Sequence, residues 1–144
     1  VCDGELYRFD INHPETNGMI EYFVRPMSGI RTAITFEELQ AYHRQAGMGF
    51  RSRPPGVVEG PVGHGTLDLV SAAARAKSLA GKPLKFTLTG PHMLAKTLRN
   101  DHYGDVAELV LAIADVLAEL ASTGHGAAHI GTVTDPGPAP FRLR

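Results

Sequence analysis

The sequence predicts an α/β fold, and three observations support this prediction. Segments with helical periodicity alternate with short apolar runs, the arrangement of βαβ units that build a parallel sheet. The clearest strand-like run, Leu84–Leu88, lies between two helical segments. The chain has 144 residues, which is enough for one domain with a sizeable core. No internal repeat is visible beyond this alternation.

Capping residues and glycines mark the ends of the predicted helices. Thr35 and Glu38 have the spacing of a capping box and predict a helix over residues 35–46. An alanine-rich segment predicts a second helix over residues 66–80. A short helix over residues 17–23 can begin at an asparagine cap.

The strongest helical pattern lies near the end of the chain. Apolar residues recur there at steps of three and four, and the acidic residues between them point elsewhere. Gly124 is a natural end for this helix. The apolar positions are Val106, Leu109, Val110, Ile113, Val116, Leu117 and Leu120.

Apolar runs predict strands at Val1-Cys2, Val57-Val58 and Leu84–Leu88, and a weaker strand at Ala127–Val133. Thr89-Gly90-Pro91 follows the third of these and leads directly into a helical segment. Such a stretch is either a plain turn or the lip of an active site, since the loops after strands carry the chemistry of α/β enzymes.

Composition excludes several classes of function. The formal net charge is −1 with dispersed basic residues, so the sequence predicts no nucleic-acid partner. No apolar run reaches the roughly 18 residues that span a bilayer, which predicts no membrane partner. The single cysteine, Cys2, excludes an internal disulfide and fits a cytoplasmic location.

Asp3-Gly4-Glu5 places two carboxylates at a predicted strand end, with Arg8 close enough to compensate one of them. Carboxylates at such a place can bind an amino group of a ligand or act as acid or base. The alternative interpretation is a solvated turn, which the residues alone favour.

The seven histidines do not form a predicted metal site. A zinc site needs three or four convergent ligands. His125 and His129 are four residues apart, but the glycines beside them make a helix there unfavourable. His92 and His102 could face a pocket, although a loop histidine is more often solvated.

Five segments, in order, resemble the catalytic barrel of the cobalamin-independent methionine synthases, within a superfamily that includes uroporphyrinogen decarboxylase. The resemblance covers about residues 1–130, and its segments are DGELYR, NGMIEYF, RPPGVVEG, KPLKFTLTGP and AELVLAIADVLAELASTG. It implies that residues 1–144 form roughly half of a (β/α)8 barrel, with LTGP at its catalytic face.

The resemblance also implies an activity, the transfer of a methyl or alkyl group to a thiol such as homocysteine. In the full-length family, zinc holds the acceptor as a thiolate, the nucleophilic form at neutral pH. Glu5 matches the glutamate that contacts the amino group of homocysteine. Asp3, beside it, is a further candidate substrate-binding residue. Arg51 and Arg53 fall where the folate enzymes approach their polyglutamate tail.

Thr89 and Gly90 are the substrate-binding candidates in LTGP. Shortly after this motif the folate enzymes place a tryptophan, apparently for the pterin ring. This chain contains no tryptophan, so the resemblance does not extend to a folate donor.

Residues 131–144 depart from the family pattern. An Asp-Glu-Pro strand end is expected near Ile130, and the chain reads GTVTDPGPAPFRLR instead. The family's zinc ligands would lie beyond Arg144, so no ligand set is predicted in this chain. We expect a truncated product or a change of reading frame.

A half-barrel has unpaired sheet edges and an uncovered interior, which predicts self-association or a complementary half. Two other functions stay open: a decarboxylase-like activity without zinc, and an inactive fragment that binds a ligand or partner.

Overall fold

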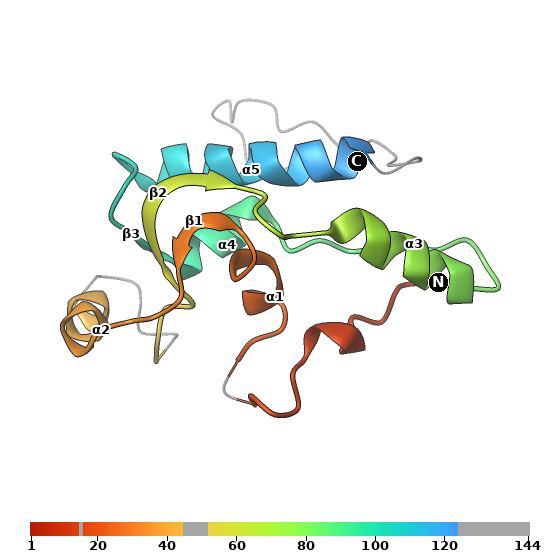
Figure 1. Ribbon diagram of the computed structural model, residues 1–144, viewed down its shortest axis with the longest axis horizontal. Coiled ribbons are helices and arrows are strands. Elements are labelled where there is room, and N and C mark those ends of the chain that lie inside the picture. Colours follow the sequence, from red (N-terminus) through yellow and green to blue (C-terminus); the bar gives the residue numbers. More distant parts are fainter. Residues whose placement is uncertain (15, 45–51, 124–144) are drawn as a thin grey trace, which may run out of the picture.

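The computed structural model describes residues 1–14, 16–44 and 52–123, and these form a mixed α/β fold (Figure 1). The predicted α/β class is therefore confirmed. The helices are α1 (Glu21–Val24), α2 (Phe36–His43), α3 (Leu69–Leu79), α4 (Pro91–Thr97) and α5 (Val106–Thr123), with a 3-10 turn, η1 (Leu6–Arg8). The strands are β1 (Ser28–Arg31), β2 (Val57–Gly63) and β3 (Arg99–Asn100).

The three strands form one sheet in the order β1-β2-β3. β2 pairs antiparallel with β1 and parallel with β3, so the prediction of a purely parallel sheet was wrong. The sequence of β1, Ser-Gly-Ile-Arg, lacks the apolar run that signals a strand. The half-barrel stays a prediction, because the described residues form only this small sheet and one further bridge.

That bridge replaces one of the predicted strands. Cys2 pairs with Lys85 in parallel, but Leu84–Leu88 contains no longer ladder. The two segments lie side by side, but neither forms the predicted regular strand. A strand needs repeated pairing along its length, and here the hydrogen bonds stop after Asp3 N–H donates to the Lys85 carbonyl.

A glycine bulge allows β1 to pair closely with β2. Gly29 has a φ of +80°, and a Cβ at this position would lie 2.3 Å from the carbonyl oxygen of Pro61. The register shifts between Ser28 and Ile30 at the same place. Only glycine fits both the backbone angle and the close approach.

The helix signals were mostly correct. The capping box of α2 is confirmed, because the Thr35 side chain accepts from Glu38 N–H and the Glu38 side chain accepts from Thr35 N–H. α3 begins later than predicted, at a cap formed by Asp68. α1 is only four residues long, and three of these fall within the predicted helix over 17–23. The predicted strand Ala127–Val133 lies outside the described residues.

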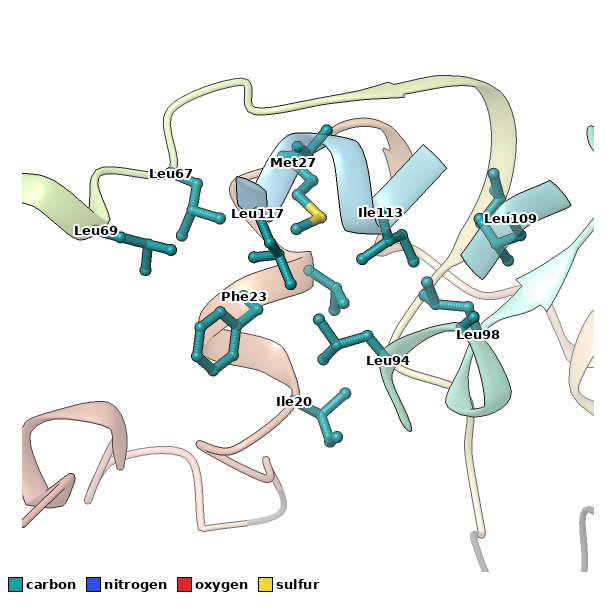
Figure 2. Packing of buried hydrophobic residues seen from close by; sticks show 14 residues of the cluster. Ile20, Phe23, Met27, Leu67, Leu69, Leu94, Leu98, Leu109, Ile113 and Leu117 are labelled. Carbon is teal, nitrogen blue, oxygen red and sulfur yellow. The ribbon is translucent and has the colours of Figure 1, made fainter. Parts of the chain in front are cut away.

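The core lies between α5, the sheet, α1 and α4 (Figure 2). α5 runs across β2 and α4 and presents the predicted apolar face to them (Figure 1). Leu109 and Ile113 are fully buried, as are Leu94 of α4 and Phe23 of α1 in the same cluster. Val106 was predicted to be on the buried face but is 43% exposed at the first turn.

α2 is tied to the sheet by charge. Arg31 of β1 pairs with Glu38 of α2 at 2.5 Å and with Glu59 of β2 at 2.7 Å. The hydrogen bonds from Arg31, together with those from Thr35, lower the pKa of Glu38 to about 2. Both partners are partly exposed, so each pair contributes modestly to stability.

Removal of a buried side chain from α5 is expected to cost much more than removal of an exposed one. Ile113 is fully buried and Leu111 of the same helix is 65% exposed. Ile113→Ala should lower the free energy of unfolding by about 2–5 kcal/mol, and Leu111→Ala by less than about 0.5 kcal/mol. Urea unfolding followed by circular dichroism measures both. Equal losses in the two variants would contradict this packing of α5.

Candidate functional site

The candidate site lies where the N-terminal segment runs beside residues 84–88. Lys85 N–H donates to the Val1 carbonyl at 2.7 Å, and Asp3 N–H donates to the Lys85 carbonyl at 3.2 Å. Because the two segments run in parallel, the residues that follow the bridge emerge at the same end. This arrangement brings Asp3 and Glu5 to Thr87.

The chain turns sharply immediately after Asp3. Gly4 has a φ of 76° and Glu5 a φ of 58°, so two consecutive residues are left-handed. Glu5 is the only non-glycine residue with positive φ among those described. A left-handed conformation costs an ordinary residue about 1 kcal/mol or more. The turn folds η1 back against the strand end and brings Arg8 beneath both carboxylates.

Arg8 is the centre of the site, and its side chain is completely buried. Its guanidinium donates to Asp3 Oδ2 at 3.0 Å and to Glu5 Oε1 at 3.3 Å. It also donates to the Thr87 carbonyl at 2.6 Å. The predicted compensation of one carboxylate is confirmed and extends to both.

Aromatic rings enclose the same guanidinium. Its Cζ atom lies 5.2–5.4 Å from the centroids of four rings, those of Tyr7, Tyr22, Phe23 and Phe86. Such contacts between a cation and ring faces stabilise the charge, more so away from water. The rings also exclude water from the ion pairs, which strengthens them.

Asp3 has no remaining capacity to bind a ligand. Oδ2 accepts from Tyr7 at 2.7 Å and from Arg8, and Oδ1 accepts from Cys2 at 3.2 Å and shares the single Thr87 hydroxyl proton, at 3.1 Å, with Glu5. Both oxygens therefore have donors, and the side chain is completely buried. Burial raises the pKa of Asp3, but these hydrogen bonds and the Arg8 charge outweigh burial and hold the pKa below its usual value. Asp3 is therefore a charged support for Arg8.

Tyr7 is held in its neutral form. Burial and the hydrogen bond to Asp3 raise the pKa of Tyr7 to about 12. The phenol therefore keeps its proton at neutral pH and donates it to Asp3. Tyr7 is not available as a general base.

Glu5 differs from Asp3 in having an available oxygen. Its Oε1 accepts from both Arg8 and the Thr87 hydroxyl. Its Oε2 has no partner in the described part of the chain, and the side chain is 24% exposed. Glu5 is thus fixed on one side and accessible on the other, and an ammonium or hydroxyl donor can bind there.

Thr89 and Gly90 have structural roles at the end of this segment. The buried Thr89 hydroxyl donates to the Met19 carbonyl at 2.6 Å, and Gly90 caps α4, with Pro91 at its first position. On the loop that carries Met19, Gly18 approaches the Arg8 carbonyl so closely that a Cβ would lie 2.4 Å from its oxygen. Thr89 therefore ties the loop before α1 to the site.

Of the two predicted arginines, the structure describes only Arg53, and Arg51 lies outside the described residues. Arg53 is exposed between α2 and β2, and it is not among the contacts of Asp3, Glu5 or Arg8. The reasoning from sequence also missed Tyr7 and Thr87. Thr87 could have been found from its position, two residues before Thr89 on the same side of an extended segment.

Among the described residues, no group of three or more His, Cys, Asp or Glu side chains is arranged to hold a metal ion. No helix in that part of the chain combines the length and apolar character needed to cross a bilayer. His125 and His129 lie outside it.

Known proteins resemble this chain in sequence and in fold. A 5-methyltetrahydropteroyltriglutamate–homocysteine methyltransferase of Arabidopsis thaliana is 33% identical over 122 residues, or 81% of this chain. The corresponding enzyme of Nitratidesulfovibrio vulgaris is 34% identical over 116 residues, or 77% of this chain. The resemblance to the cobalamin-independent methionine synthases is confirmed.

The match covers only a small part of these methionine synthases. The chain spans 15% and 14% of the length of the two curated relatives. The solved B12-independent methionine synthase from Shewanella sp. W3-18-1, in complex with selenomethionine, aligns with a TM-score of 0.54 and 22% identity. That alignment covers 76% of this chain and 30% of the other. No protein-family profile matches the chain.

Asp3→Asn tests the charged support of Arg8 in this site. The substitution leaves Arg8 underpaired, and we expect a loss of about 3 kcal/mol in unfolding free energy at neutral pH. The pKa of Asp3 is lowered on folding, so its stabilisation is present above the ordinary value of 3.8 and is lost as the pH falls through the lower folded value. The difference between wild type and variant should therefore shrink in acid.

Urea unfolding across this pH range measures the difference, with Asp115→Asn on the exposed side of α5 as the matched control. A difference that stays constant into acid would contradict an ionised, buried Asp3.

Proposed function

We propose that this chain is part of an enzyme that transfers a methyl or alkyl group to a small thiol of the homocysteine type. In this proposal Glu5 binds the amino group of the thiol. The observation that carries it is the unpaired Glu5 Oε2 beside the Cys2–Lys85 bridge, in a chain whose relatives are homocysteine methyltransferases.

The geometry favours Glu5 for this role because its carboxylate is preorganised. Arg8 and Thr87 hold Oε1, so Oε2 is presented without loss of side-chain freedom on binding. An ammonium group bound there forms a charge-assisted hydrogen bond. Asp3 acts one step further back, because its own oxygens are filled and its charge holds Arg8 in place.

The remaining predicted residues belong to the same proposal. Arg51 and Arg53 would bind anionic groups of the donor, since guanidinium groups pair with carboxylates in two-pronged fashion. Thr89 and Gly90 would border the substrate at the strand end.

In this proposal the chain forms roughly half of a (β/α)8 barrel and acts in the cytoplasm, where Cys2 stays reduced. The described residues contain no group of side chains arranged to hold zinc. We propose that the chain associates with a second copy or with a complementary half.

Homocysteine binding by the 144-residue chain tests the role of Glu5. Isothermal titration should detect binding to wild type, weakened about 10- to 100-fold in Glu5→Gln, because a charged hydrogen bond is worth about 1.5–3 kcal/mol. Glu37→Gln is the matched control, since Glu37 is an exposed residue in the first turn of α2. Its affinity should equal that of wild type.

Equal affinities for Glu5→Gln and wild type would remove Glu5 from the site. Absence of binding in every variant would favour the alternative of an inactive fragment that binds some other partner.

A further inference from the structure

α3 is attached to the rest of the fold only at its beginning. Leu69, in its first turn, is its only buried residue, and the helix extends away from the core beside the N-terminus (Figure 1). Isolated helices of 11 residues are marginal in water, and packing normally supplies their stability. The remainder of α3 therefore requires a covering surface.

The uncovered face of α3 borders a hollow of about 640 Å³. The opposite wall of this hollow is the N-terminal segment with Tyr22 and Leu84. Two apolar side chains at its border are strongly exposed, Leu79 at 83% and Val1 at 62%. From α3 and its cap, the lining residues are Asp68, Ser71, Ala72, Arg75, Ala76 and Leu79. Their spacing of three and four residues places them on one face.

This face carries one charge of each sign. Asp68 uses Oδ1 to cap the helix at Ser71 N–H, at 2.9 Å, and hydrogen bonds within this first turn lower its pKa, so it carries a negative charge at neutral pH. The Arg75 side chain has no partner among the described residues. Seven residues separate the two charges, which corresponds to two turns or about 10.5 Å along the helix axis.

We propose that a second copy of this chain docks on this surface, with the two α3 helices packed antiparallel around a two-fold axis. The midpoint between Asp68 and Arg75 lies between Ser71 and Ala72. A two-fold axis at that point places Asp68 of each copy opposite Arg75 of the other, because such an interface is self-complementary. The small side chains at the crossing point allow the helices to approach closely.

The inference extends the proposed self-association by naming its surface, and it does not depend on the transferase function. The second copy is favoured over an unrelated partner because the charge pattern is complementary to itself. Each pair would also give Arg75 a carboxylate partner, which it does not have among the described residues.

Charge reversal provides the test. In sedimentation equilibrium, the average mass of wild type should rise with concentration from 15.4 kDa toward twice that value. Asp68→Lys and Arg75→Glu should each remain monomeric, because like charges then face each other. An equimolar mixture of the two variants should dimerise, since each then faces the opposite charge of the other. The double variant should also dimerise.

Asp68→Lys removes the helix cap, so circular dichroism and thermal melting are measured alongside. If that variant unfolds, Arg75→Glu against Arg75→Lys decides the question, with dimerisation lost in the first and kept in the second. A monomeric wild type at all concentrations would overturn the proposal. So would dimers that persist in both single variants. Homocysteine titration of the same samples separates this result from the fate of the Glu5 site.

Discussion

The buried guanidinium of Arg8 is the constraint on which the arrangement of the N-terminal half depends. A charge without solvent is costly unless it is paired and hydrogen-bonded. Here the pairing draws on Asp3, Glu5 and the Thr87 carbonyl, while rings from η1, α1 and the 84–88 segment enclose the ion. One side chain thereby joins these three segments, whereas the nearby β-bridge links only Cys2 with Lys85. The left-handed backbone at Glu5 is tolerated because these contacts determine its position.

The same constraint gives the two carboxylates different roles. Both are acidic side chains within three residues, and composition alone would treat them alike. The structure fills both oxygens of Asp3 and only one of Glu5. Binding capacity therefore depends on the number of donors that reach each group. A residue that carries charge without free lone pairs can orient a site, whereas a half-occupied carboxylate can also bind.

Local signals in the sequence were sufficient for part of this fold. The apolar spacing of α5, the capping box at Thr35 and the buried Val57-Val58 each arise within a short window, and each is present. β1 and the aromatic rings around Arg8 depend on partners distant in sequence, so no short stretch of sequence predicts them. The acidic turn and Arg8 were predicted as neighbours. Thr87 was not, because its contacts with Asp3 and Glu5 span more than 80 residues.

The surface of α3 is physically linked to the buried charge. Asp3 and Tyr7 line the hollow beside α3 and also hold Arg8 in place. A second copy bound in that hollow would contact Asp3 and Tyr7. These two residues hold Arg8, which in turn holds Glu5. In the proposed dimer, docking against this wall would act on the orientation of Glu5, and by thermodynamic linkage a ligand bound to Glu5 would act equally on docking. The proposed docking surface and the proposed ligand site would then be coupled through Asp3 and Tyr7, although Arg75 and Glu5 belong to different segments.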